Sequence, residues 1–254
     1  NTVEKLLKSL NKGPFRKSVV EEASRLLLDE SFEEKKDENK SILGFTNGVY
    51  DFNYFVFRNG MPEDYITMNT GYNYIPLNKN TREYIDVMNF MDKIMPDSEM
   101  QKYLLSILSS CLTGHVSDES FYVFTGSGAN GKSKLMELMN KVLGSLFKPM
   151  DVRIITEKRG GSSAASPDLA DKKGIRLCPL DEPNHTDEIN TGFMKFFTGG
   201  DKLMARLLFS NPIYFKPQFK PFLLCNKLPQ IKSDDDGTWR RVKVIEFGSK
   251  FWKH

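Results

Sequence analysis

The chain has 254 residues, of which 39% are hydrophobic and 27% are charged, a balance that fits a soluble globular protein. This length allows one large domain, or one domain with an appendage, and a first residue other than Met predicts an excised fragment. The net charge is only +3, so a nucleic-acid partner has to be argued from local placement rather than from bulk charge.

Composition also excludes several classes of protein. No apolar run approaches the roughly 20 residues that a membrane-spanning helix needs, and no secretory signal is visible. The three histidines are scattered, which argues against a zinc site. The three cysteines lie in apolar segments without metal-ligand spacing, so we expect reduced core residues of an intracellular protein: Cys111, Cys178 and Cys225.

Residues 1–80 are predicted to form a small mixed module of helices and strands. Apolar residues at helical spacing from Val3 predict a helix that ends at Gly13-Pro14, and a second stripe from Val19 to Leu27 predicts a helical hairpin. Residues 29–40 are dense in both charges and are expected to form a solvated loop or a helix end.

A β-hairpin is expected in the second half of this module. Its strands lie between Leu43 and Phe52, and Asn47-Gly48 is the pair that tight hairpin turns favour. Asn59-Gly60 is expected to close a second turn.

Residues 81–118 are predicted to be helical. One amphipathic helix runs from about Thr81 to Ile94. A second begins at Ser98, where Gln101 three residues on is the signature of a capping box. Its regular apolar stripe is attributed to core packing.

A glycine-rich stretch is the most informative motif of the chain. It lies between residues 121–125, a predicted buried strand, and a helical apolar stripe from Leu135 to Val142 that Gly144 ends. Its pattern of Gly, four residues, Gly, Lys and Ser is that of a phosphate-cradling loop at a helix N-terminus, and the alternative is an ordinary glycine turn. The predicted nucleotide-binding residues are Gly126, Ser127, Gly128, Ala129, Asn130, Gly131, Lys132 and Ser133.

Two later strands are expected to end beside this loop, as in a parallel α/β sheet. Strand 175–180 ends in Asp181-Glu182, which we assign to the metal and to the base that polarises the attacking water; solvated strand-end acids are the alternative. Strand 222–225 ends in Asn226, which can orient the water, sense the γ-phosphate or belong to a plain turn. In the loop itself, Lys132 would reach the terminal phosphates and Ser133 would bind Mg²⁺.

A projecting hairpin is predicted at residues 207–215, with Ser210-Asn211-Pro212 as its turn. Basic and aromatic residues interleave around it, which suits contact with a single nucleic-acid strand. The alternative is a surface hairpin with solvated lysines.

Paired arginines, Arg240 and Arg241, precede a final predicted strand at residues 242–247. Such a pair can be a surface salt-bridge cluster. In a ring-shaped ATPase, an arginine of this kind is presented to the γ-phosphate of the neighbouring subunit, because guanidinium matches the developing phosphoryl charge.

Taken in order, these motifs resemble those of the superfamily 3 helicases of DNA viruses and phages. The nearest resemblance is to the primase-helicase family of poxviruses and other nucleocytoplasmic large DNA viruses, with satellite-phage relatives. It covers nearly the whole chain, strongly from about residue 119 to 247 and more weakly before residue 80. The segments that carry it are Asn-Gly-Val-Tyr-Asp at 47–51, the loop at 126–133, Pro-Asp-Leu-Ala at 167–170, Asp-Glu at 181–182, Thr-Gly-Gly-Asp at 198–201 with Arg206, Cys-Asn-Lys-Leu-Pro at 225–229 and Gly-Thr-Trp-Arg-Arg at 237–241.

The resemblance implies an α/β fold in which a P-loop, AAA+-like αβα ATPase core with a parallel sheet follows a smaller mixed helical and β module. It divides the chain into an N-terminal module at 1–80, a collar-like helical segment at 81–118 and a superfamily 3 ATPase domain at 119–254. It also implies a hexameric ring that binds ATP and Mg²⁺ between subunits and moves on single-stranded DNA, usually 3′ to 5′.

Matched residue by residue, the resemblance assigns the Walker A, Walker B and sensor 1 roles and an arginine finger. The catalytic residues it implies are Lys132, Glu182, Asn226 and one of Arg240 and Arg241, with Ser133 and Asp181 on the metal. Many relatives have a single acid, which matches Glu182, and the hairpin tip here lacks the lysine of some superfamily members. DNA contacts are therefore assigned to Arg159, Lys202, Arg206 and Lys216.

The expected function is an ATP-dependent DNA helicase or translocase that drives viral replication inside the host cell, in the cytoplasm or nucleus. Its expected partners are single-stranded DNA, further copies of the chain, and other replication proteins or an attached primase domain, with no membrane. Two alternatives remain: a P-loop small-molecule phosphotransferase, which needs an acceptor pocket, and a nucleotide-gated DNA-loading module with little hydrolysis.

Overall fold

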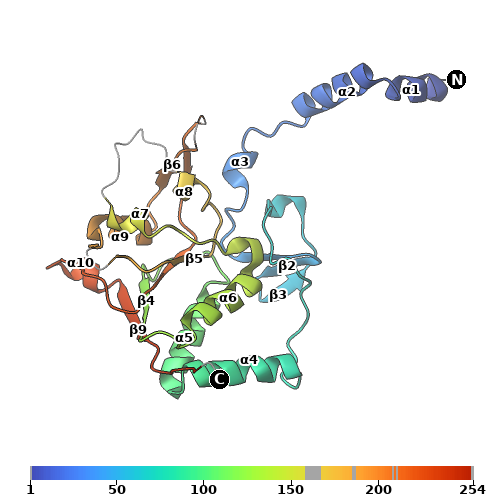
Figure 1. Ribbon diagram of the computed structural model, residues 1–254. Coiled ribbons are helices and arrows are strands. Elements are labelled where there is room, and N and C mark those ends of the chain that lie inside the picture. Colours follow the sequence, from blue (N-terminus) through green and yellow to red (C-terminus); the bar gives the residue numbers. More distant parts are fainter. Residues whose placement is uncertain (1, 158–166, 185–186, 208, 210, 253–254) are drawn as a thin grey trace. The chain divides into compact units, whose positions relative to one another are not determined.

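The computed structural model describes residues 2–157, 167–184, 187–207, 209 and 211–252 (Figure 1). By compactness the chain divides into two units, Asn1–Lys36 and Asp37–His254. The predicted boundaries at residues 80 and 118 divide the chain by function and not by compactness. They therefore stay predictions.

The first unit contains the helices α1 (Thr2–Leu10), α2 (Gly13–Leu26) and α3 (Phe32–Lys35). The predicted helical hairpin is wrong: α1 and α2 lie end to end, and α2 does not fold back to pack beside α1 (Figure 1). Lys12 between them has an extended backbone, with φ −90° and ψ 125°. Pro14 lies in the first turn of α2, where its fixed φ favours the start of a helix, so no loop is left for a reversal. No residue of these two helices, all of which are described, is buried.

The second unit begins with an antiparallel sheet of β1 (Ile42–Phe45), β2 (Gly48–Asp51) and β3 (Val56–Arg58), in which the predicted hairpin is confirmed. Its turn is shifted by one residue, because Phe45 pairs with Gly48 and leaves Thr46 and Asn47 as the turn. A Cβ on Gly48 would lie 2.5 Å from the carbonyl oxygen of Arg58, so the close approach of β3 requires glycine in the ladder. The residues Asn59-Gly60 follow β3, a strand that the sequence did not predict.

Helices α4 (Arg82–Ile94) and α5 (Ser98–Ser110) confirm the two predicted helices. The predicted capping box of α5 is wrong. Asp97 is the cap, and its carboxylate accepts a hydrogen bond from the N–H of Met100 at 2.8 Å, while Gln101 donates to Asp92. Aspartate caps a helix as well as serine does, so one residue upstream satisfies the same N–H groups.

A four-stranded parallel sheet forms the centre of the second unit, as predicted. Its strands lie in the order β5 (Leu177–Leu180), β8 (Lys220–Leu224), β4 (Phe121–Thr125) and β9 (Val242–Glu246). Helix α6 (Lys132–Leu143) follows the glycine-rich stretch after β4, and Gly144 ends it. Strand, glycine loop and helix therefore follow one another as the sequence predicted.

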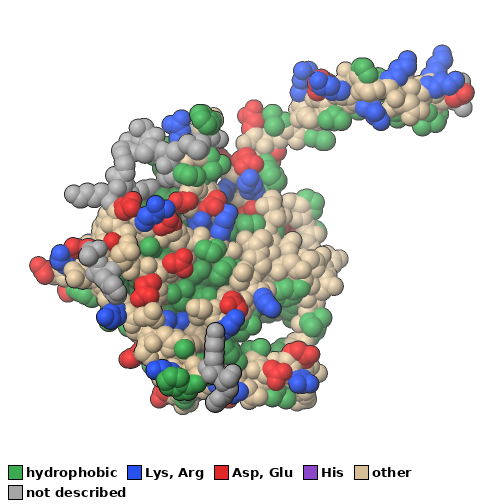
Figure 2. Space-filling model, viewed as in Figure 1, with side chains coloured by type: hydrophobic (Ala, Val, Ile, Leu, Met, Phe, Trp, Pro, Cys, Tyr) green, Lys and Arg blue, Asp and Glu red, His purple; other side chains and the backbone are tan. Residues whose placement is uncertain are grey.

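Shorter elements complete the fold. They are η1 (Pro62–Asp64), η2 (Gly144–Leu146), α7 (Arg153–Thr156), α8 (Pro167–Ala170), α9 (Thr191–Thr198) and α10 (Asp236–Trp239). Among the described residues, no helix is long and apolar enough to cross a membrane. Basic and acidic side chains are interspersed on the face shown in Figure 2.

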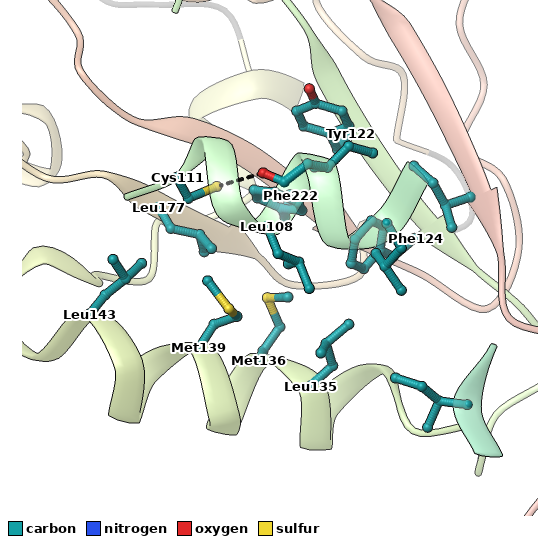
Figure 3. Packing of buried hydrophobic residues seen from close by; sticks show 14 of the residues in the cluster. Leu108, Cys111, Tyr122, Phe124, Leu135, Met136, Met139, Leu143, Leu177 and Phe222 are labelled. Carbon is teal, nitrogen blue, oxygen red and sulfur yellow. Dashed lines mark hydrogen bonds between the residues drawn. The ribbon is translucent and has the colours of Figure 1, made fainter. Parts of the chain in front are cut away.

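Side chains of the parallel strands alternate between two hydrophobic cores, one on each face of the sheet. Tyr122 and Phe124 of β4 pack against α5 and α6 (Figure 3), whereas Phe121 and Val123 face the core that contains α9. The sheet is therefore a middle layer between two layers of helices. The three cysteines are free and buried in these cores, as predicted, and burial raises the pKa of the Cys111 thiol to about 12.

Strands β6 (Leu203–Ala205) and β7 (Ile213–Phe215) form the predicted hairpin with a different first strand. Leu203 and Ala205 point into the second core, which fixes them as the strand, while Leu207 and Phe209 of the predicted strand are exposed. The described residues 206, 207, 209, 211 and 212 lie between these strands at the tip, and residues 208 and 210 are outside the described part of the chain.

Candidate functional site

The predicted site residues lie where parallel strands end. Because the strands of the sheet run in one direction, their carboxyl ends meet at one edge, where open α/β sheets bind ligands. Gly126 follows β4, the acids at 181–182 follow β5, and Asn226 lies two residues after β8. Phe247, directly after β9, lies at the same edge.

The glycine loop has the backbone that a phosphate-binding turn requires. Gly131 is the N-cap of α6 with φ +92°, and Gly126 and Gly128 also have positive φ. A Cβ on Gly131 would lie 2.4 Å from Cγ2 of Ile94, so glycine is needed here for both conformation and space. The first N–H groups of α6 have no carbonyl partner within the helix, and they lie at its positive end. This arrangement can hold an anion.

Lys132 is folded back onto the loop. Its Nζ donates to the carbonyl oxygen of Gly126 and to Oδ1 of Asn130, both at 3.1 Å, and the residue is 7% exposed. Burial lowers the pKa of the ammonium, and the nearby Glu182 and Cys225 oppose that shift. The loop is thus closed by the side chain that is predicted to reach the phosphates.

Glu182 and Asn226 are joined directly. The backbone N–H and the Nδ2 group of Asn226 donate to the two carboxylate oxygens of Glu182 at 2.7 and 3.0 Å. A Cβ on Gly128 would lie 3.7 Å from Oδ1 of Asn226, so the amide also lies against the glycine loop. Glu182 and Asn226 line an open cleft of about 510 Å³ together with Pro183, Asn184 and Lys227.

The residues present fit a nucleoside triphosphate with Mg²⁺. Positive-φ glycines and a helix N-terminus form a concave set of N–H donors, and the buried ammonium has only neutral oxygens as hydrogen-bond partners within the loop. Ser133 and Asp181 are exposed, and they offer the hydroxyl and carboxylate oxygens that Mg²⁺ prefers. Within the described ranges, no group of three or more His, Cys, Asp or Glu side chains forms a metal cluster by itself.

The two arginines lie at the other end of the strands, where the parallel strands of the sheet begin. They directly precede β9, and the carbonyl oxygen of Arg241 accepts from the N–H of Phe121 at the start of β4. The five residues of β9 separate them from the glycine-loop edge by about 16 Å. The structure therefore does not bring the arginine pair to the loop of its own chain.

Both arginines bind one carboxylate. Arg240 and Arg241 donate to Oε2 of Glu119 at 2.8 and 2.6 Å, and Arg241 also donates to the carbonyl oxygen of Gly237 at 2.6 Å. The Arg240 side chain is 64% exposed and that of Arg241 is 10% exposed. Arg241 is therefore a buried part of the fold, while the Arg240 side chain is accessible from outside the chain.

Three of the predicted DNA contacts lie on the β6–β7 hairpin. Lys202 and Lys216 flank the pair Leu203↔Phe215 at its base and are exposed, and Arg206 is at the tip. The fourth, Arg159, lies outside the described residues.

Sequence reasoning missed one functional neighbour, Glu119, and one contact of the predicted loop residue Asn130. Glu119 shows no motif, but it precedes β4 as Arg241 precedes β9, so the pairing of these strands brings them together. Asn130 was assigned to the loop without a role, and its Nδ2 donates to the carbonyl oxygen of Phe247 at 3.2 Å. Both contacts follow from strand order, which the sequence does not show.

The chain is similar to known proteins along nearly its whole length. Residues 2–109 match the family described as "D5 N terminal like". A "Putative helicase" of Acanthamoeba polyphaga mimivirus is 58% identical over 252 residues, which are 99% of this chain and 26% of that protein. A "Putative helicase" of Invertebrate iridescent virus 6 is 34% identical over 250 residues, 96% of this chain and 26% of that protein.

More distant relatives extend the same group. A "Putative primase" of African swine fever virus (strain Badajoz 1971 Vero-adapted) is 25% identical over 261 residues, 99% of this chain and 27% of that protein. An apo structure of the NrS-1 C-terminal region shares the fold alone, with a TM-score of 0.53 at 16% identity over 68% of this chain and 39% of that one. The chain spans about a quarter of the length of the curated relatives it matches. Residues 2–109 therefore carry a D5 N-terminal-like domain, and the chain is homologous to proteins of large DNA viruses that are named putative helicases and primases.

Proposed function

We propose that the chain is the motor part of a viral replicative DNA helicase, which hydrolyses ATP between the subunits of a hexameric ring and moves on single-stranded DNA. The observation that carries the proposal is the convergence of the glycine loop, Glu182 and Asn226 at one edge of a parallel sheet. Homology to putative viral helicases supports it. In this proposal the sheet and its helices are a P-loop core of AAA+ type.

Glu182 takes a proton from the attacking water. Asn226 holds both carboxylate oxygens, and each oxygen keeps a lone pair for the water. Because Asn226 also lies against Gly128, a shift of the glycine loop on nucleotide binding moves the residue that orients the base. This contact gives Asn226 the role of a sensor.

Lys132 changes partners when a nucleotide binds. Phosphate oxygens are anionic and accept stronger hydrogen bonds than the neutral oxygens of Gly126 and Asn130, so the ammonium moves to the terminal phosphates. Ser133 and Asp181 would hold Mg²⁺, which neutralises charge on the phosphate oxygens.

Arg240 acts on the nucleotide of the neighbouring subunit. A closed ring of identical subunits brings one face of each against a different face of the next. The arginine edge of one sheet then faces the glycine loop of its neighbour, and the exposed Arg240 is better suited to this contact than the buried Arg241.

The wider assignments belong to the same proposal. Residues 1–80 and 81–118 form the N-terminal module and a collar-like segment, and residues 119–254 form the ATPase domain. Because the chain is about a quarter of its relatives' length, an attached primase domain or other replication proteins are further partners. The site of action is the infected host cell.

ATP turnover by the purified chain is expected to rise when single-stranded DNA is added. The test measures phosphate release with and without an oligonucleotide, and phosphate transfer to nucleoside acceptors in parallel. A small-molecule phosphotransferase would phosphorylate an acceptor and ignore DNA. A DNA-loading module would bind ATP without measurable turnover. Either of those results overturns the proposal.

Replacing Phe209 with alanine is expected to weaken binding of single-stranded DNA about tenfold and to leave basal ATP turnover unchanged. The ring is fully exposed at the hairpin tip, and stacking of a base on an aromatic side chain contributes about 1–3 kcal/mol. Fluorescence anisotropy with a labelled oligothymidine measures the change. Leu207→Ala, which removes an exposed apolar side chain without a ring, is the control. Wild-type affinity in the Phe209 variant would mean that the strand does not contact the tip.

A further inference from the structure

The segment after β9 runs across the glycine loop. The N–H of Phe251 donates to the carbonyl oxygen of Ala129 at 2.7 Å, and the carbonyl oxygen of Phe247 accepts from Asn130. The hydroxyl of Ser249 donates to the carbonyl oxygen of Lys93 at 2.7 Å, which fixes the segment to the end of α4 as well. In Figure 1 the chain that follows β9 reaches α4. Residues 247–251 are thus fastened to the loop at two points and to α4 at a third.

This segment holds an aromatic ring beside the helix N-terminus. A Cβ on Gly131, the N-cap of α6, would lie 3.6 Å from Cε2 of Phe251, and the Phe251 side chain remains 41% exposed. Phe251 belongs to neither of the two hydrophobic clusters, so its ring is part of neither core. Trp252 follows it and is 71% exposed, with Nζ of Lys250 at 4.4 Å from its ring centroid.

We propose that Phe251 forms the base-binding side of the nucleotide site and stacks on the nucleobase. The inference rests on the proposed function, in which the loop holds the phosphates. A nucleotide whose phosphates lie at the N-terminus of α6 has its base next to the loop, and an exposed ring fixed by the backbone there provides a π face at little entropic cost. A phenyl ring has no hydrogen-bonding group, so it recognises the presence of a base and does not distinguish adenine from guanine.

Of the two aromatic residues, Phe251 is the one in position. Its backbone is hydrogen-bonded to the loop and its ring lies on Gly131, whereas the Trp252 ring pairs with Lys250. Phe251→Ala is therefore the test and Trp252→Ala the matched control, because both remove an exposed aromatic side chain from adjacent positions.

Calorimetric titration of the whole chain with ATP and with inorganic tripolyphosphate separates the base from the phosphates. Phe251→Ala is expected to weaken ATP and GTP binding by about tenfold each and to leave tripolyphosphate binding unchanged, as expected for loss of one stacking contact. Phe251→Trp, which keeps a stacking surface, should restore ATP affinity, and Trp252→Ala should match the wild type.

Two results would overturn the inference while the proposed function stands. Equal loss of ATP and tripolyphosphate affinity in Phe251→Ala would mean that the ring only supports the loop, and unchanged ATP affinity would mean that the base lies elsewhere. A wild-type chain that binds neither ligand would overturn the proposed function itself, and this inference with it.

Discussion

Glu182→Gln is expected to lower steady-state ATP turnover by about 10²–10⁴-fold, the range that a positioned general base contributes. ATP affinity should stay within a factor of two or so of the wild type, because the substitution removes only the proton acceptor. The glutamine carbonyl can still accept from the N–H of Asn226, and rotation of the Asn226 amide lets its Oδ1 accept from the new amide. The local fold is therefore kept.

Matched variants separate the predicted roles at this edge. Lys132→Ala should abolish tight ATP binding, because it removes the charge that the phosphates need. Asp181→Asn should raise the Mg²⁺ concentration needed for half-maximal turnover. Nucleotide binding, turnover and melting temperature of all three variants are measured together. Wild-type turnover by Glu182→Gln in the presence of DNA would exclude Glu182 as the base.

Arg240→Ala is expected to leave ATP binding and the melting temperature unchanged and to stop hydrolysis. An arginine that stabilises the transition state from a neighbouring subunit contributes about 10³–10⁵-fold in turnover. An exposed ion pair such as Arg240 with Glu119 contributes only about 0–1 kcal/mol to stability, so the fold does not depend on it. Mixing Arg240→Ala with Lys132→Ala should recover part of the activity, because some interfaces then pair an intact arginine with an intact loop.

The neighbouring variants show whether this loss is structural. Arg241→Ala removes charge-assisted hydrogen bonds from a buried side chain and should lower the melting temperature by several degrees. Glu119→Gln weakens the hold on both guanidinium groups but leaves Arg240 in place, so it should retain turnover. If Glu119→Gln loses as much activity as Arg240→Ala, the loss is structural, and if the mixture stays inactive, the arginine does not act on the neighbouring subunit.

The strand order explains which parts of the fold the sequence could predict. Apolar runs of the right length predicted β4 and α6 because their burial dominates the local choice of structure. The hairpin strand at 203–205 was misplaced because Leu207 and Phe209 are as apolar as Leu203, and only the tertiary core decides which of them is buried. The start of α5 at Ser98 was predicted correctly, but its cap was assigned one residue late because Asp97 and Ser98 cap equally well.

The sequence could predict which strand ends carry the residues of the candidate site. It could not predict the hydrogen bonds between those residues. Parallel strands carry their carboxyl ends to one edge, so Gly126, Glu182 and Asn226 could be expected near one another. That Asn226 holds both oxygens of Glu182 depends on backbone geometry after β8, for which the sequence has no signal. The pairing of Glu119 with the arginines likewise needs the contact between β4 and β9.

That contact has a mechanical consequence. β4 and β9 pair along their whole length, from Phe121↔Val242 to Thr125↔Glu246, and neither can slide without breaking the ladder between them. One end of this ribbon leads into the glycine loop and the other carries Glu119 and the arginines. The two ends of this strand pair therefore move together as one rigid unit. In the proposed ring, a tilt of this strand pair at one nucleotide would displace Arg240 at the next, and occupancy would be communicated between subunits without any change in fold.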